Sequence, residues 1–245
     1  MPRHFFIAGA QRCATTYLYR ILDQHPDIAM ARPMRPEPKY FIRPGPAGSV
    51  AGYRDEFFPS AATPWLGEKS TSYIERPLAA ARIARLLPDA EVFFVLRDPV
   101  ERALSNYRFS VINGLETLAL EDALDAEEER CGAAFEGTSV SPFAYVGRGL
   151  YASQLDAWAA IFPRRQMHVL TTEQLVGDTR ATLDRLFAVL QVDPSVPLAG
   201  IDEPVNSSGP MPDAPERVLE RLRVAFADSN ADLARRYDVA TGDWR

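Results

Sequence analysis

The sequence predicts an α/β fold with a central, mostly parallel β-sheet flanked by helices, in a single domain spanning residues 1–245. Short apolar segments rich in β-forming residues alternate with longer helical patterns, as in parallel sheets covered on both faces. The hydrophobic content of 47% and the charged content of 24% suit a sizeable core. Residues 91–96 are nearly all apolar, as expected for a central buried strand.

The expected strands are apolar runs without helical spacing. The first run ends at Gly9, and a short one lies near Ile28. The strands are expected at about 4–9, 28–30, 65–69, 91–96 and 166–171.

The expected helices repeat apolar residues every three or four positions. They lie near 15–24, 77–87, 98–112, 117–130, 149–162, 179–190 and 214–237. Two apolar stripes, Tyr151 to Phe162 and Leu183 to Leu190, are predicted to face the core. The acidic stretch 116–130 is predicted to be a solvated helix face.

The loop after the first strand is the most informative motif. After Gly9 come small and hydroxyl residues, and a helical pattern then begins. This order directs backbone N–H groups and the positive end of a helix dipole at one point, which suits a phosphate. Arg12, Thr15 and Thr16 add a charge and two hydroxyls, so we predict a P-loop-like nucleotide-binding core. The alternative is an ordinary strand-to-helix turn without a ligand.

The same loop departs from the Walker A pattern of nucleoside triphosphatases. Counted from Gly9, Ala14 stands at the second glycine and Thr15 at the lysine. The lysine that would reach the β- and γ-phosphates is missing, which disfavours hydrolysis of ATP or GTP.

The charge, the hydropathy and the cysteine content of the chain limit the kinds of binding partner and the cellular location to be expected. The net charge of −6 and the pI near 5.2 argue against nucleic acid or an anionic membrane as the main partner. Met1 to His4 lead directly into the first strand, and no apolar run approaches the length of a membrane span. Cys13 and Cys131 make no disulfide framework. A cytoplasmic protein is expected.

Lysine usage singles out two positions. Of 27 basic residues only Lys39 and Lys69 are lysines. A compact ammonium group is therefore predicted to be needed at these places, although codon bias could produce the same scarcity.

A second anion element follows the strand at 91–96. Arg97 ends the strand, Asp98 suits the N-cap of the next helix, and Pro99 suits its first position. Ser105 lies two turns on, so Arg97 and Ser105 are predicted to converge on one anion at the carboxyl end of the sheet. The alternative is an arginine paired with Asp98 and a serine on the helix surface.

Gly9 to Thr16, followed by Arg97-Asp98-Pro99 and Ser105, resembles the cofactor signatures of sulfotransferases that use 3′-phosphoadenosine 5′-phosphosulfate (PAPS). The order is similar to that of the heparan sulfate branch and its bacterial relatives. The resemblance covers roughly residues 4–240. Further local matches are 22–28, 68–73, Leu150-Tyr151 with Trp158, Phe162-Pro163, and 206–209.

The resemblance implies how the donor is bound. Arg97 and Ser105 correspond to the 3′-phosphate site. The 5′-phosphosulfate loop and a further cofactor loop correspond to Gln11, Arg12, Cys13, Ala14, Thr15 and Thr16, and to Ser207, Ser208 and Gly209. The family often has a lysine and glycines where this chain has Arg12, Cys13 and Ala14. Arg12 keeps the charge for a catalytic role but cannot donate a proton.

The resemblance also places the catalytic residues. Glu37, held between Pro36 and Pro38, corresponds to the catalytic glutamate and is the predicted general base. Lys69 corresponds to the lysine that neutralises the bridging oxygen. Lys39 could hold an anionic acceptor or lower the pKa of Glu37. The alternatives are a solvated carboxylate for Glu37 and an exposed lysine without a role, above all for Lys39.

Other chemistries have weaker signals. Glycan-binding relatives carry an aromatic residue or histidine where Lys39 stands, so a long glycosaminoglycan is not expected. His4, His25 and His168 are predicted to be structural, with His25 as the one loosely placed alternative base. No spacing suggests a metal site, and the mechanism needs no Mg²⁺.

The predicted enzyme transfers a sulfuryl group from PAPS to a hydroxyl, less readily an amine, of a small-molecule or glycosylated acceptor such as a natural product. Adenosine 3′,5′-bisphosphate (PAP) is the other product. The alternatives are a non-catalytic PAP-binding module and a nucleotide or metabolite kinase. The strand at 91–96 ends in Arg97 rather than the acidic residue that a kinase would place there. The sequence specifies neither the acceptor nor the oligomeric state.

Overall fold

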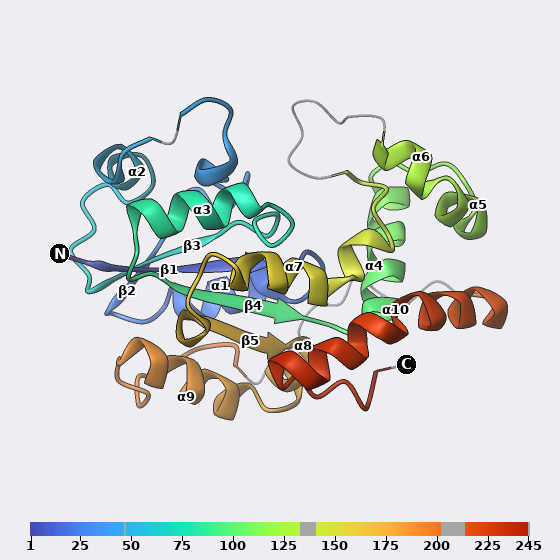
Figure 1. The fold of residues 1–245 in the computed structure, drawn as a ribbon. Coiled ribbons are helices and arrows are strands. Elements are labelled where there is room, and N and C mark those ends of the chain that lie inside the picture. Colours follow the sequence, from blue (N-terminus) through green and yellow to red (C-terminus); the bar gives the residue numbers. More distant parts are fainter. Residues whose placement is uncertain (47, 133–140, 202–213, 245) are drawn as a thin grey trace. The chain divides into compact units, whose positions relative to one another are not determined.

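Parallel strands form one sheet in the order β2-β3-β1-β4-β5 (Figure 1). The computed structural model describes residues 1–46, 48–132, 141–201 and 214–244. The five strands in these ranges are Arg3–Gly9 (β1), Ile28–Met30 (β2), Trp65–Lys69 (β3), Glu91–Leu96 (β4) and Met167–Thr171 (β5). The predicted α/β fold class and each predicted strand are confirmed.

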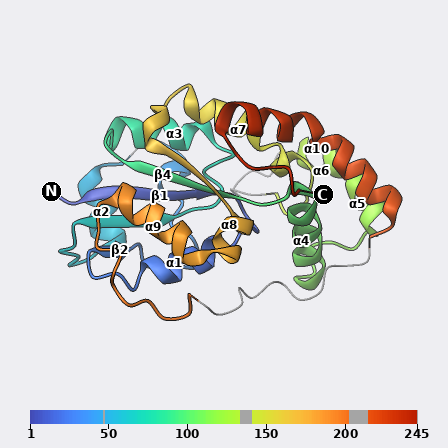
Figure 2. The same cartoon turned by 90° about the horizontal axis from the view of Figure 1, so that it is seen from below.

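Central strands are apolar on both faces because helices cover both sides of the sheet. From Phe5 to Ala8, β1 is fully buried, and β4 is buried from Val92 onward. Gly67 in β3 leaves room for its neighbours, because a Cβ there would lie 2.2 Å from Cζ of Phe5. Figure 2 shows α3 on one side of the strands and α1 on the other.

The helices follow the predicted pattern with two additions. They are Thr15–Leu22 (α1), Val50–Phe57 (α2), Pro77–Leu86 (α3), Pro99–Ile112 (α4), Leu120–Asp125 (α5), Glu127–Gly132 (α6), Tyr151–Ala159 (α7), Thr172–Gly177 (α8), Thr179–Leu190 (α9) and Glu216–Tyr237 (α10). The sequence pattern did not predict α2 and α8. Side-chain caps support both: Ser49 accepts from the Gly52 N–H, and Thr171 forms a capping box with Gln174.

The predicted helix over 117–130 is interrupted, and its solvated acidic face is confirmed only in part, because most of its carboxylates are exposed but two are buried. The segment forms two short helices, α5 and α6. The buried carboxylate of Glu116 accepts hydrogen bonds from Arg130 at 2.9 Å and from the hydroxyl of Tyr145 at 2.6 Å. Glu127 accepts from the backbone N–H groups of Val146 and Gly147. Protein donors replace water around these two carboxylates.

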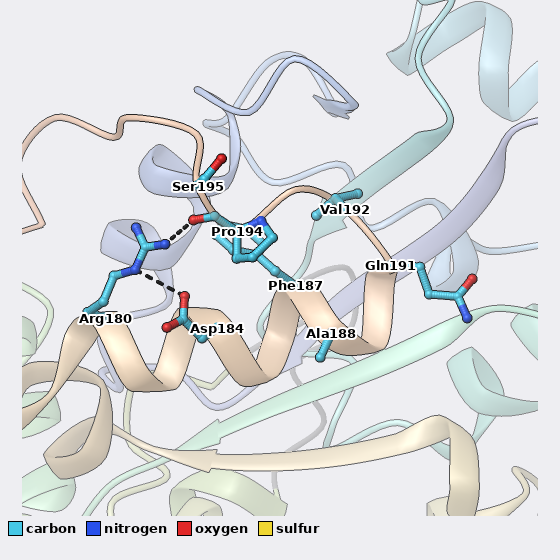
Figure 3. A pocket seen from close by; sticks show the side chains of 8 residues that line it. All are labelled: Arg180, Asp184, Phe187, Ala188, Gln191, Val192, Pro194 and Ser195. Carbon is cyan, nitrogen blue, oxygen red and sulfur yellow. Dashed lines mark hydrogen bonds and ion pairs between the residues drawn. The ribbon is translucent and has the colours of Figure 1, made fainter.

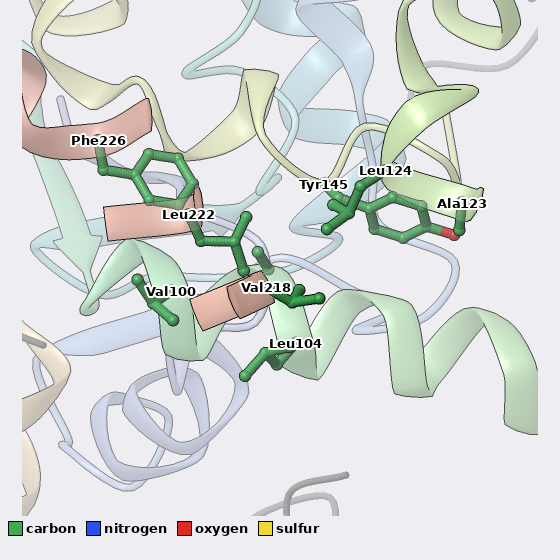
Figure 4. Packing of buried hydrophobic residues seen from close by; sticks show 9 residues of the cluster. Val100, Leu104, Ala123, Leu124, Tyr145, Val218, Leu222 and Phe226 are labelled. Carbon is green, nitrogen blue, oxygen red and sulfur yellow. The ribbon is translucent and has the colours of Figure 1, made fainter. Parts of the chain in front are cut away.

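The chain divides into two compact units. The first, Met1–Leu96 with Ala157–Val205, holds the sheet. The second, Arg97–Asp156 with Asn206–Arg245, has its own apolar cluster, in which side chains of α4, α5 and α10 meet (Figure 4). Val100 and Leu104 of α4 pack in this cluster with Leu222 and Phe226 of α10. A single domain over 1–245 stays a prediction.

The apolar stripes predicted to face the core are confirmed. Their members are buried: Tyr151, Leu155, Trp158 and Phe162 in one stripe, and Leu183, Leu186, Phe187 and Leu190 in the other.

Acid is expected to destabilise the first unit through His4. This buried ring accepts a hydrogen bond at Nε2 from Nε of Arg54, 3.2 Å away. Burial, helped by the Arg54 charge, lowers the pKa of His4 from 6.5 to about 4. As the pH falls, His4 therefore takes up a proton near pH 6.5 in the unfolded chain but only near pH 4 in the folded chain. Stability is lost as the pH falls through this window, by about 2 kcal/mol between pH 7.5 and 5.

Urea unfolding at pH 7.5 and pH 5 tests this expectation. His4→Gln should lose about 2 kcal/mol less than the wild type over that interval, because glutamine does not titrate. The carboxylates titrate in both proteins, so their difference isolates His4. An equal loss in both proteins would contradict the assignment.

Candidate active site

The loop between β1 and α1 depends on the glycine at its start. A Cβ on Gly9 would lie 2.5 Å from Cγ2 of Ile74 and 3.2 Å from the Thr71 carbonyl oxygen. Glycine therefore lets the segment after β3 approach the end of β1. The Ile74 N–H donates to the Ala8 carbonyl at 2.8 Å, which holds this close approach.

Two non-glycine residues of the loop adopt left-handed conformations. Arg12 has φ 71° and Ala14 has φ 56°. Left-handed residues within tight loops turn successive N–H groups inward, which produces the concave anion sites called nests. Ala14 precedes α1 and places no side-chain cap on its first N–H groups. The conformation suits the predicted anion site.

The predicted donor residues Gln11 to Thr16 thus lie together in this loop and the first turn of α1. Cys13 is fully buried, and its thiol donates to the Gln11 carbonyl at 3.6 Å. Cys13 and Ala14 would therefore contact a ligand through their backbone. Arg12, Thr15 and Thr16 supply the polar side chains. Their binding roles stay predictions.

The predicted base and the predicted lysine form an ion pair. Nζ of Lys69, at the end of β3, donates to Oε1 of Glu37. The Thr71 N–H donates to Oε2 at 2.9 Å, and the Thr71 hydroxyl lies 3.0 and 3.1 Å from the two oxygens. The Lys69 side chain is 3% exposed and that of Glu37 is 16% exposed. The Lys69 side chain is therefore buried, whereas that of Glu37 stays partly exposed.

Strand order explains why this pair lies at the same sheet edge as the loop between β1 and α1, residues 10–14, here called the anion loop. Ile7 in β1 is paired with Lys69 in β3, and both strands end at the same sheet edge. Helix α1 leads from β1 toward β2, whereas α3 leads from β3 to β4 on the other side of β1. Open α/β sheets bind ligands at such a reversal of strand order.

A buried polar network behind the pair was missed by sequence reasoning. Glu68 is fully buried, and its carboxylate accepts from the hydroxyls of Ser70 at 2.6 Å and Tyr53 at 2.7 Å. The hydroxyl of Tyr73 also hydrogen bonds to Glu68. Burial raises the pKa of Glu68, and the hydroxyl hydrogen bonds oppose the shift. The polar run Glu68 to Tyr73 after an apolar strand was the available signal.

Lys39 lies in the turn that follows Glu37. Its backbone is left-handed, with φ 49°, and its N–H donates to the Ser70 hydroxyl at 2.9 Å. The Lys39 backbone thus ties the turn after Glu37 to the segment that follows β3. A role for its ammonium group stays a prediction.

The second anion element lies in the second unit. Asp98 caps α4 by accepting the Val100 N–H at 2.9 Å, and Pro99 is the first residue of the helix, as predicted. Arg97 forms an ion pair with Glu101 at 3.1 Å, and Ser105 is buried on α4. Convergence of Arg97 and Ser105 on an anion stays a prediction. The predicted loop residues Ser207, Ser208 and Gly209 lie outside the described residues.

The histidines make structural contacts. In His25, Nδ1 accepts the Asp27 N–H at 3.1 Å and Nε2 lies 3.0 Å from the Asp193 carbonyl oxygen. Both ring nitrogens are therefore engaged, which leaves no free lone pair for a base. Nε2 of His168 lies 2.8 Å from the Glu91 carboxylate.

Residues 1–46, 48–132, 141–201 and 214–244 contain no group of three or more His, Cys, Asp or Glu residues that could hold a metal ion. No helix in this described part of the chain has the length and hydropathy of a membrane span.

A groove of about 400 Å³ lies along α9 (Figure 3). Arg180 at one end pairs with Asp184 at 3.0 Å and donates to the Pro194 carbonyl. The other lining residues are Phe187, Ala188, Gln191, Val192 and Ser195. None of them is a predicted site residue.

The parallel sheet, the anion loop after its central strand and the adjacent ion pair define a P-loop-like α/β nucleotide-binding fold. Residues 47–195 match the model of a protein family described as "Sulfotransferase family", and the chain belongs to this family. The predicted family and enzyme class are confirmed.

Named relatives agree with this assignment. Human heparan sulfate glucosamine 3-O-sulfotransferase 3B1 is 30% identical over 180 residues, which cover 74% of this chain and 44% of the relative. Human bifunctional heparan sulfate N-deacetylase/N-sulfotransferase 3 is 29% identical over 211 residues, covering 78% of this chain and 22% of the relative. The chain thus spans less than half the length of these curated relatives.

Solved structures show the same fold. A sulfotransferase from Alicyclobacillus acidocaldarius has a TM-score of 0.83 and 29% identity, and the match covers 100% of this chain and 99% of that chain. Mouse sulfotransferase SULT7A1, complexed with PAP, has a TM-score of 0.58 and 12% identity over 96% of this chain and 86% of that chain. At that identity the second match concerns the fold alone.

Proposed function

We propose that this protein transfers a sulfuryl group from PAPS to a hydroxyl of a small-molecule or glycosylated acceptor, with Glu37 as the general base. An amine acceptor is the less favoured form. The observation that carries the proposal is the ion pair between Glu37 and Lys69 at the sheet edge where the anion loop also lies. We further propose that the chain is one cytoplasmic domain, in keeping with its two free cysteines.

The residues present fit the donor. The anion loop and the first turn of α1 combine the Arg12 guanidinium, the hydroxyls of Thr15 and Thr16, and left-handed turns that suit a phosphate-sized anion. We assign this loop to the 5′-phosphosulfate, and Arg97 with Ser105 to the 3′-phosphate. When bound, PAPS supplies the sulfuryl group.

Glu37 would remove the acceptor proton. As the acceptor oxygen forms its bond to sulfur, its proton passes to a carboxylate oxygen of Glu37. Donation from the Thr71 N–H and hydroxyl fixes the direction of this carboxylate. Its partial exposure leaves room for the acceptor to approach.

Lys69 would stabilise the leaving group. The sulfur–oxygen bond to the phosphate breaks, and the electron pair stays on the phosphate oxygen. A buried ammonium beside that oxygen stabilises the developing negative charge strongly, because water does not screen it. Lys69 pairs with Glu37 here, so its charge is already held at the site.

The relatives support an acceptor with a hydroxyl or amine. The name of one curated relative specifies 3-O-sulfation of heparan sulfate glucosamine, and that of another specifies N-sulfation of heparan sulfate. We propose a smaller acceptor for this chain, because the family resemblance implies an aromatic residue or histidine for glycan binding at the position of Lys39.

Calorimetry with PAP tests the donor site. Arg97→Ala is expected to weaken PAP binding by about 10- to 100-fold, since a hydrogen bond to a charged group is worth about 1.5–3 kcal/mol. Adenosine 5′-phosphosulfate lacks the 3′-phosphate and is the matched control ligand. Its affinity should be the same for the variant and the wild type.

Two further readouts separate the alternatives. PAP binding as tight in Arg97→Ala as in the wild type would contradict the 3′-phosphate assignment. A kinase would bind ATP in preference to PAP. A non-catalytic module would bind PAP but transfer no ³⁵S-labelled sulfate from PAPS to any member of an acceptor panel.

A further inference from the structure

Two hydroxyls hold the turn that carries Glu37, here called the base segment (Glu37–Phe41). The Lys39 N–H donates to the Ser70 hydroxyl oxygen at 2.9 Å, and the Phe41 N–H donates to the Tyr73 hydroxyl oxygen at 3.1 Å. Both hydroxyls also hydrogen bond to the buried Glu68. We propose that Ser70 and Tyr73, whose hydroxyls Glu68 aligns, are positioning residues that place Glu37, an inference that rests on the proposed function.

The direction of each proton follows from the chemistry of the groups. A backbone N–H can only donate, so the oxygens of Ser70 and Tyr73 must accept from the base segment. Each hydroxyl has one proton, which must then point elsewhere. The Ser70 hydroxyl donates its proton to Oε1 of Glu68 at 2.6 Å, and the Tyr73 hydroxyl also hydrogen bonds to this carboxyl group, so Glu68 aligns both hydroxyls in the same sense.

Burial makes this alignment costly to lose. Glu68, Ser70 and Tyr73 are each fully buried, so water does not replace a lost partner. A buried N–H left without an acceptor costs about 1–3 kcal/mol. If Glu68 no longer took the hydroxyl protons, the hydroxyls would be free to rotate and the Lys39 and Phe41 amides would lose their acceptors.

The short path from these amides to Glu37 transmits the effect. Pro38 separates Glu37 from Lys39, and its ring restricts the backbone there. Lys39 itself holds a left-handed turn. Fixing the Lys39 and Phe41 amides therefore fixes the direction in which Glu37 extends toward Lys69. A displacement of about 1 Å in a catalytic group can cost about 100-fold in rate.

Tyr53 offers a matched control. Its hydroxyl donates to Glu68 at 2.7 Å, as the Tyr73 hydroxyl also does, but its ring rather than its hydroxyl packs on the base segment. Tyr53→Phe and Tyr73→Phe each remove one hydroxyl group that hydrogen bonds to Glu68, and each keeps the buried ring. Tyr73→Phe alone also removes the acceptor of the Phe41 N–H.

The experiment compares the two variants in sulfate transfer and in amide hydrogen exchange. Tyr73→Phe is expected to lower kcat by about 10-fold with a KM for PAPS within about twofold of the wild type, since the geometry of the base changes and the donor site does not. Exchange at the Phe41 amide should accelerate about 10-fold or more in Tyr73→Phe. Tyr53→Phe should show a much smaller change in both measurements.

Each outcome decides the inference. Equal effects of the two variants on kcat and on exchange would overturn it. If Tyr73→Phe does not fold, Ser70→Ala replaces it, and exchange at the Lys39 amide must accelerate for the inference to stand. A turnover number of Glu37→Gln equal to that of the wild type would contradict the assignment of Glu37 as general base. The exchange measurement, in contrast, reports on the base segment whether or not the protein is active.

Discussion

Glu37→Gln is expected to lower the turnover number by about 100-fold or more, the range that general-base catalysis contributes. Glutamine has the same shape and still accepts from the Thr71 N–H at the position where Glu37 accepts at 2.9 Å. It cannot take a proton from an acceptor hydroxyl. The affinity for PAP should stay within about twofold, because the predicted donor residues are untouched.

Turnover and PAP calorimetry on the same preparations provide the measurement. Glu56→Gln is the matched control, because Glu56 also pairs with a cation, Arg43 at 2.7 Å, on the surface of the same unit. This control removes the same charge outside the site. Unchanged turnover of Glu37→Gln with a confirmed acceptor would remove Glu37 from the mechanism.

Lys69→Ala is expected to lower turnover by about 100- to 1,000-fold, comparable to the loss of one oxyanion donor. The affinity for PAP should fall much less, because the leaving oxygen gains its full charge only as the bond to sulfur breaks. Burial of the Lys69 side chain, with 3% exposed, makes its charge effective at the site.

Lys39→Ala is the natural comparison, because Lys39 is the other lysine of the chain. Lys39→Ala should lower the PAP affinity and the turnover number far less than Lys69→Ala does. Equal losses of turnover and of PAP affinity in Lys69→Ala would make Lys69 a binding residue. The double variant with Glu37→Gln should lose less than the product of the single losses, because the two residues are in contact.

The sequence predicted the sheet well because its strands are buried on both faces. In β1 and β4 this burial produces near-continuous apolar runs that need no tertiary information to recognise. Helix α4 was equally clear, since Asp98 and Pro99 are local start signals. In contrast, α2 and α8 are short and take their stability from caps and packing rather than from an apolar stripe.

The site was predicted only in part, because its parts come from distant segments. Glu37 and Lys69 are 32 residues apart, and only the family resemblance suggested that they act together. The carboxylate of Glu116 looked solvated, yet Arg130 and Tyr145 enclose it. Likewise, the hydroxyl protons around Glu68 have directions set by the base segment across the fold.

The left-handed backbone at Arg12 and Ala14 has a thermodynamic consequence for ligand affinity. Residues with a Cβ resist this conformation by about 1 kcal/mol each, whereas glycine adopts it freely. A glycine-rich loop has many accessible backbone conformations and therefore loses more conformational entropy when it binds a ligand. In this structure Arg12 and Ala14 already hold the left-handed shape, so we expect the proposed anion to bind with little further loss of conformational entropy in the loop.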